Sequence, residues 1–161
     1  TAHGLAKDWG VSIAEASETI NKWYAARKEV REWQENARKQ AAKTLFTKTL
    51  LGRKRLVTGM IMGKYKASMA GRAVINTPIQ GGAADIVAMG MLNIHRNQRL
   101  KELKWFMILQ IHDELILEGP EESSEEAFAI VKECMEKPLA RPLSVALPVD
   151  GSICDNWYEG K

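Results

Sequence analysis

Two apolar runs on either side of a short polar segment constrain the fold of this chain more than any other part of its sequence. The first segment, Lys104 to Ile111, contains the apolar run Trp105 to Leu109, and the second segment is Leu115 to Leu117. Runs of this length are typical of strands, and the short connection predicts that they pair as a hairpin. Gly119-Pro120 ends the second strand, because proline cannot donate to a continuing ladder. The tip of this hairpin holds His112-Asp113-Glu114.

The beginning of the sequence has the periodicity of helices. Ser12 and Glu15 form the pattern of a capping box, in which side chains satisfy free backbone amides at a helix start. Apolar residues recur at helical spacing as far as Ala41, with a soft break at residues 26–28 that fits either one bent helix or two. We expect this stripe, which includes Trp23 and Trp33, to lie in the core. The alternative is that the tryptophans stack on nucleic-acid bases.

A second hairpin is predicted from residues 45–51 and 55–58, with Gly52 at a turn position that favours positive φ. Residues 56–68 have no clear period and are interpreted as a loop. A helix that begins near Ser68 should end at Pro78, because proline lacks an amide donor and clashes with the preceding turn.

A new helix is expected after Gly81-Gly82, another over residues 121–137, and a strand over 143–149. The apolar residues of the two helices should point inward: Val87, Met91, Ile94, Ala127, Ile130, Val131 and Cys134. Taken together, these elements predict an α+β fold with helices packed on a small antiparallel sheet.

The 161 residues are 45 % apolar, which suffices for the core of one domain or of one piece of a larger domain. The longest apolar runs are five residues, whereas a membrane-spanning helix needs about 20, so an integral membrane protein is excluded. Cys134 and Cys154 cannot build a disulfide framework or a cysteine-rich zinc site, and we expect free thiols. The chain starts at Thr1 without a leader, so we expect a processed or partial sequence.

The net charge of +3 conceals a gradient along the sequence. Residues 21–72 hold fourteen Lys or Arg and three acidic residues, a net charge of +11. Residues 113–161 hold four Lys or Arg and twelve acidic residues, a net charge of −8. A basic half is typical of proteins that bind nucleic acid. Solvated basic helix faces explain the charge equally well, and charge alone leaves both interpretations open.

Asp113 and Glu114, adjacent carboxylates at the hairpin tip, form the first candidate site. A tight turn can direct both side chains toward one point, and such a pair is costly unless a cation compensates it. Carboxylate oxygens suit Mg²⁺, and two-metal phosphoryl transfer needs carboxylates to hold the ions. A polar turn that binds no metal would explain the same residues.

Arg72, Asn76 and Gln80 form the second candidate, because their spacing places them on one helix face at least as far as Pro78. Arginine can bind phosphate, and amides can hydrogen-bond sugar or base edges. The third candidate is the cation run Arg53-Lys54-Arg55, which suits phosphate contact. A solvent-facing stripe and a solvated turn are the respective alternatives. The sequence has no P-loop, Gly-x-Ser-x-Gly or Gly-x-Gly-x-x-Gly motif.

These segments resemble motifs of the DNA polymerase I family (family A), in family order. Gln110-Ile111-His112-Asp113-Glu114-Leu115 is similar to the family's third conserved motif, and residues 72–85 resemble the palm helices before it. Residues 49–55 resemble its Leu-Gly-Arg-Arg hairpin. Gly4-Leu5-Ala6 resembles the stretch after the nucleotide-binding fingers helix, and Asp150 with Asn156-Trp157 resembles the closing segment.

A narrower resemblance links the chain to the plant and protist organellar branch of this family, which copies mitochondrial and plastid genomes. Its residues are 97–103, 117–120 and 156–161. This resemblance implies location in the mitochondrion or plastid.

The family resemblance implies a role for each matching residue. Asp113 matches the palm aspartate that binds the catalytic metals, and Glu114 matches its neighbour, which supports the metal site. His112 matches a residue near the primer terminus. The residues that match contacts to template and primer are Arg72, Asn76 and Gln80. Arg53 and its neighbours are expected to contact the duplex backbone.

The resemblance implies the C-terminal part of a DNA-directed DNA polymerase, which adds dNTPs to a primer 3′ end in replication and repair with two Mg²⁺ ions. It implies primer-template DNA and dNTP as partners, no membrane partner, and a monomer. Residues 1–45 would be a helical fingers-side segment and residues 46–161 a palm segment, together one incomplete polymerase domain.

The sequence also departs from the family. The first metal aspartate and the nucleotide-binding fingers helix have no match, so we expect this chain alone not to polymerise. Gly71 stands where Glu is usual, Gly82 stands where Thr or Ser is usual, and residues 56–68 lack the usual Leu-Pro. The alternative function is a non-catalytic module that binds double-stranded DNA.

Overall fold

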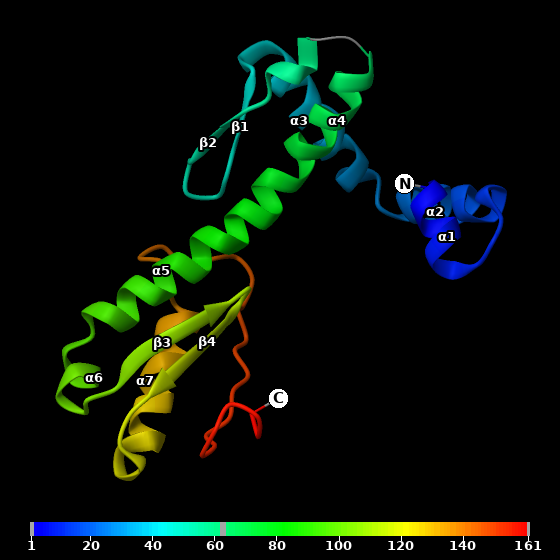
Figure 1. The fold of residues 1–161 in the computed structure, drawn as a ribbon. Helices are drawn as coiled ribbons and strands as arrows, with labels where there is room; N and C mark the ends of the chain where they lie inside the picture. Colours follow the sequence, from blue (N-terminus) through cyan, green and yellow to red (C-terminus); the bar gives the residue numbers. More distant parts are fainter. Residues whose placement is uncertain (1, 62–63, 161) are drawn as a thin grey trace. The chain divides into compact units, whose positions relative to one another are not determined.

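The computed structural model describes residues 2–61 and 64–160 (Figure 1). The chain divides into two compact units. One comprises the chain up to Lys48 with Gly52–Pro78, and the other comprises Thr49–Leu51 with the chain from Ile79 onward. Each unit combines helices with a pair of antiparallel strands, which confirms the predicted α+β class. Among the described residues, no helix has the length and apolar character needed to span a bilayer.

Helices α1 (Ala2–Trp9), α2 (Ile13–Ala26) and α3 (Lys28–Thr44) open the first unit. The predicted capping box starts α2: the Ser12 amide donates to the Glu15 carboxylate at 2.9 Å, and the Glu15 amide donates to the Ser12 hydroxyl at 3.2 Å. The soft break resolves into two helices, because Arg27 leaves helical geometry with φ −138° and ψ 62°.

The prediction that the apolar stripe lies in the core is only partly correct. Ala16 and Ala41 are buried, but Trp23 and Trp33 are 44 % and 40 % exposed. The Trp23 ring instead lies edge-on to Tyr24, with centroids 5.1 Å apart, and beneath the Arg27 guanidinium at 4.9 Å. Helical spacing shows which residues share a face, but burial requires another element to pack on that face.

Strands β1 (Phe46–Lys48) and β2 (Lys54–Leu56) form the first hairpin, and its turn residue Gly52 has φ 88°, as its position predicted. The expected loop at 56–68 is shorter than predicted. A 3₁₀ turn occupies Thr58–Ile61, and α4 (Lys64–Asn76) begins before Ser68. Residues 62–63 lie outside the described residues. Ala41, Val57 and Val74 are the buried residues of the core that joins α3, α4 and this hairpin.

The prediction that Pro78 ends a helix is wrong. A π-helix occupies Thr77–Gly81 directly after α4, and α5 (Gly82–Arg96) follows without a break, so Gly81 and Gly82 are helical. The wider π turn leaves room for the proline ring, which would clash with the preceding turn of an α-helix. Proline has no amide hydrogen to donate to the carbonyl of Val74, four residues earlier. The buried Thr47 hydroxyl donates to that carbonyl at 3.3 Å.

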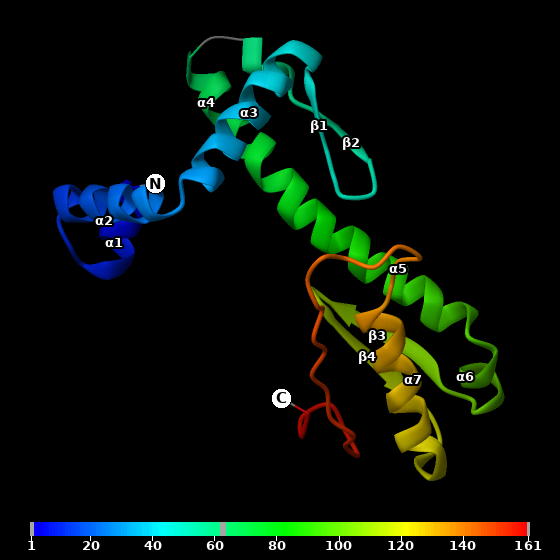
Figure 2. The same cartoon turned by 180° about the vertical axis from the view of Figure 1, so that it is seen from behind.

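The second unit continues from α5 with α6 (Gln98–Glu102), β3 (Phe106–Ile111), β4 (Glu114–Glu118), a 3₁₀ turn (Glu121–Ser123) and α7 (Ser124–Glu136). Helix α7 lies against one face of the β3–β4 hairpin, behind the strands in Figure 1 and in front of them in Figure 2. The buried residues of this core are Ile94, Leu100 and Ala127, with Ile130, Val131 and Cys134 packed against them; all of these except Leu100 were predicted to point inward.

Helix α6 is fastened to α7 by a two-bond ion pair. The Arg99 guanidinium donates to both carboxylate oxygens of Glu126, at 2.6 and 3.0 Å. These bonds hold the pKa of Glu126 below its usual value and raise the pKa of Arg99.

The strand predicted over residues 143–149 is not formed; those residues contain neither helix nor strand. Val145 is 67 % exposed. Alternating side chains stabilise a strand only when a neighbouring strand supplies the ladder, and no described strand pairs with this segment.

Candidate nucleic-acid and metal site

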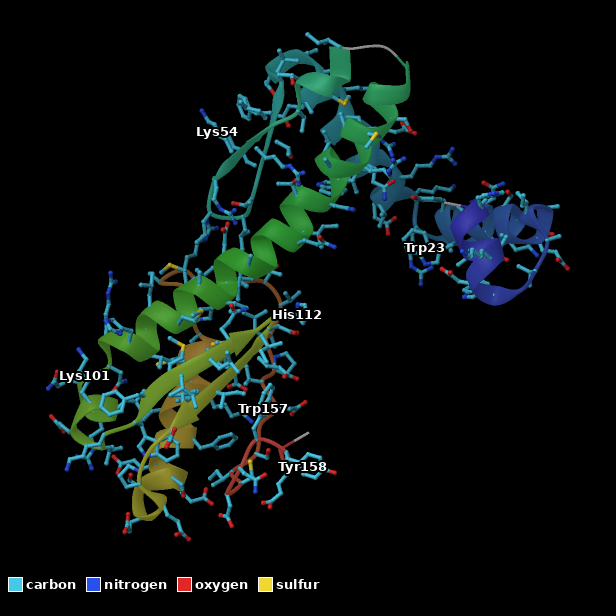
Figure 3. The ribbon with its side chains drawn as sticks, in the orientation of Figure 1. Trp23, Lys54, Lys101, His112, Trp157 and Tyr158 are labelled. Atoms are coloured by element: carbon cyan, nitrogen blue, oxygen red, sulfur yellow. The ribbon has the colours of Figure 1, made fainter. Side chains whose placement is uncertain are left out.

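The tip of the β3–β4 hairpin is a tight turn formed by His112 and Asp113 (Figure 3). Ile111 pairs with Glu114, so only two residues connect the strands. His112 has φ 55°, in the left-handed region that costs an L-residue about 1–2 kcal/mol. The Gln110 side-chain amide donates to the His112 carbonyl. Ladder pairing and this bond together hold the strained residue in place.

The two candidate metal ligands lie directly at this turn. Asp113 is the second turn residue and Glu114 is the first residue of β4, and both side chains are exposed. Neither carboxylate forms an ion pair within the part of the chain that the structure describes. Both therefore offer hard oxygen donors of the kind Mg²⁺ prefers. The described residues contain no group of three His, Cys, Asp or Glu that could hold a metal ion, so this turn offers only part of a complete ligand set.

The pairing of β3 with β4 contains a register shift of the kind that a β-bulge produces. The register shifts between Met107, opposite Leu117, and Leu109, opposite Ile116. A bulge redirects the side chains beyond it and occurs frequently beside active sites.

Arg72 and Asn76 lie on successive turns of α4 in the first unit, as their spacing predicted. Both side chains are exposed, whereas Val74 between them is fully buried. The described residues provide no ion pair or hydrogen bond to either side chain, so both can accept an external ligand. Gln80 belongs to the second unit, lies in the π-helix and is also exposed.

The β1–β2 hairpin concentrates positive charge. Lys48 pairs with Lys54 across the strands, and both ammonium groups lie over the Phe46 ring, at 5.6 and 4.9 Å from its centroid. Like charges opposite each other on a hairpin are destabilising. A nearby polyanion would relieve that repulsion. Arg53, the candidate contact to the DNA backbone, is exposed in the segment that connects β1 to β2. Figure 3 shows Lys54 extending away from the strands.

One contact of this hairpin was missed by the sequence reasoning. The Arg55 guanidinium donates to the hydroxyl of Thr77 at 3.3 Å, and Thr77 is 7 % exposed. The sequence groups Arg55 with the cations that are expected to contact a duplex. Pro78 was the sequence signal for this contact. A helix that passes through proline lacks one backbone hydrogen bond, so another element is expected to contact it there.

Comparison with known proteins identifies what this chain is similar to. The pattern of DNA polymerase family A matches residues 1–159. The chain is 50 % identical over its whole length to DNA polymerase I B, chloroplastic/mitochondrial, of Arabidopsis thaliana, and 36 % identical to the thermostable DNA polymerase I of Thermus filiformis. It spans 16 % and 19 % of the lengths of these two relatives.

A solved structure is similar over most of the chain. It is the POL domain of Pol1 from M. smegmatis, in complex with DNA primer-template and dNTP. The match has a TM-score of 0.82 and 34 % identity, and it covers 91 % of this chain and 26 % of that one.

Proposed function

The chain belongs to DNA polymerase family A, and from that premise we propose that it is the C-terminal part of a template-directed DNA polymerase, which adds dNTPs to a primer 3′ end in replication and repair. One observation carries the proposal: Asp113 and Glu114 are exposed at a strained two-residue turn, without ion-pair partners among the described residues. Two neighbouring exposed carboxylates without ion-pair partners leave their oxygen atoms available to a hard cation such as Mg²⁺.

Divalent metal ions are general for this family, and the donor chemistry of Asp113 and Glu114 fits Mg²⁺. Asp113 would bind the metal directly and Glu114 would support the site, as part of a complete site for two ions. Bound Mg²⁺ supplies activation of the attacking hydroxyl and neutralisation of charge on the phosphate. The protein's own contribution is to fix the carboxylates in advance, through the β3–β4 ladder and the bond from Gln110 to His112.

The remaining candidates would bind the nucleic acid. Arg72, Asn76 and Gln80 are proposed to contact template and primer, and His112 to lie near the primer terminus. Arg53 is proposed to contact the duplex backbone, beside a hairpin on which Lys48 and Lys54 already repel each other. We propose primer-template DNA and dNTP as the partners of the complete protein. We also propose that it acts as a monomer in the mitochondrion or plastid, where the plant relatives are located.

The test is Asp113→Asn in the natural protein, with Glu118→Gln as the matched control. Glu118 is an exposed carboxylate at the far end of β4, the strand that begins directly after Asp113. We expect Asp113→Asn to lower primer extension at least about a thousandfold, the loss of several kcal/mol of metal stabilisation, while duplex affinity stays within about twofold. Glu118→Gln should extend primers like the wild type. Undiminished extension by Asp113→Asn would refute the catalytic role and favour the non-catalytic DNA-binding module.

A further inference from the structure

We propose that Arg55 and Thr77 are positioning residues, which hold the end of α4 so that Asn76 is presented to DNA. The inference rests on the proposed function of Asn76 as a DNA contact. It assigns Arg55 a different role from that of Arg53, the proposed contact to the duplex backbone.

The proposed support consists of two hydrogen bonds, donated by the two residues of one cross-strand pair in the β1–β2 hairpin. Thr47 and Arg55 pair directly across the strands. The Thr47 hydroxyl donates to the carbonyl of Val74, and the Arg55 guanidinium donates to the hydroxyl of Thr77. The two acceptors, on Val74 and Thr77, lie on either side of Asn76 in the sequence. Asn76 therefore belongs to the segment that this cross-strand pair holds.

This segment needs support because of Pro78. Proline removes an amide donor from the helix, and the chain changes from α to π geometry at Thr77. Isolated π turns are rare and are found frequently at functional sites. Without outside bonds, the residues next to the change could relax to another helical geometry and carry Asn76 with them. A displacement of about 1 Å is enough to weaken a positioned contact substantially.

Thr77 makes the proposal testable, because its side chain is buried and cannot itself serve as a phosphate contact. Thr77→Val removes the acceptor of Arg55 at nearly constant volume, and Thr77→Ser keeps it. Arg55→Gln removes the guanidinium from an exposed position. Arg53→Gln is the comparison for a direct phosphate contact, and Asn76→Ala removes the contact that is being positioned.

The measurement is the Kd for primer-template DNA at several salt concentrations, with the natural protein and each variant. We expect Thr77→Val and Arg55→Gln each to weaken binding between about twofold and about tenfold, the value of one hydrogen bond. Neither should change the salt slope, whereas Arg53→Gln should lower it by about 1. Thr77→Ser should bind like the wild type. Arg55→Gln should add nothing to Asn76→Ala, because both act through one contact.

Two results would overturn the positioning role. The first is wild-type binding by Thr77→Val together with a lower salt slope for Arg55→Gln, which would make Arg55 a phosphate contact. The second is additivity of Arg55→Gln with Asn76→Ala. If Thr77→Val fails to fold, Arg55→Gln still decides between the two roles, through the salt slope of its DNA binding and through its additivity with Asn76→Ala. Failure of the proposed function is distinct from both, because Asn76→Ala itself would then bind DNA like the wild type.

Discussion

The Thr47 hydroxyl lies 3.3 Å from the carbonyl oxygen of Val74. Pro78 has no amide hydrogen to donate to that oxygen. Thr47 and Val74 are both buried, so water does not readily replace the bond. A residue 27 positions earlier in the sequence thus completes the helix that contains the proline.

The first prediction concerns this bond. Thr47→Val keeps the volume but leaves a buried carbonyl without its hydroxyl donor, and we expect a loss of about 1–3 kcal/mol of unfolding free energy. Thr47→Ser retains the hydroxyl and serves as the control. Denaturant unfolding of the natural protein, with hydrogen exchange at the end of α4, measures the effect. Equal stability of the valine and serine variants would contradict it.

The second prediction concerns the turn at His112, whose φ is 55°. Asparagine tolerates left-handed geometry, whereas a β-branched residue does not. His112→Val should therefore destabilise the β3–β4 hairpin by about 1–2 kcal/mol relative to His112→Asn. Hydrogen-exchange protection of the β3 and β4 amides reports this difference. Similar protection in both variants would show that the turn bears no such strain.

The third prediction is a pH dependence at α6. Because the folded pKa of Glu126 is below its usual value near 4.5, the folded state binds fewer protons than the unfolded state. The contribution of its pair with Arg99 is present above that value and is lost as the pH falls through the folded pKa. Protection of the α6 amides should therefore fall more steeply below pH 4.5 in the wild type than in Glu126→Gln. Parallel pH profiles would exclude the pair as the cause.

The fourth prediction separates the two cysteines. Burial, with the Glu133 carboxylate nearby, raises the pKa of the Cys134 thiol, whereas Cys154 is exposed. The thiolate is the reactive form. Iodoacetamide at neutral pH should therefore label Cys154 well before Cys134, as peptide mass mapping can measure. Denaturation should equalise the two rates, and faster labelling of Cys134 in the folded protein would contradict the prediction.

Local signals were sufficient for several parts of this protein. The capping box at Ser12, the positive φ at Gly52 and the β3–β4 hairpin with its polar tip depend on residues close together in sequence. The motif around Asp113, one of those on which the family resemblance rests, is likewise a continuous run of residues. In each case the determining interactions are short-range.

Other features depended on partners distant in the sequence, and only the tertiary structure decided them. The helix passes through Pro78, and residues of the β1–β2 hairpin donate hydrogen bonds to the Val74 carbonyl and to the Thr77 hydroxyl beside it. Trp23 stays 44 % exposed, and residues 143–149 form no strand because no described strand pairs with them. Periodicity and composition specify what a segment can become. Whether it does so is decided by the hydrogen-bond and packing partners that the fold brings to it.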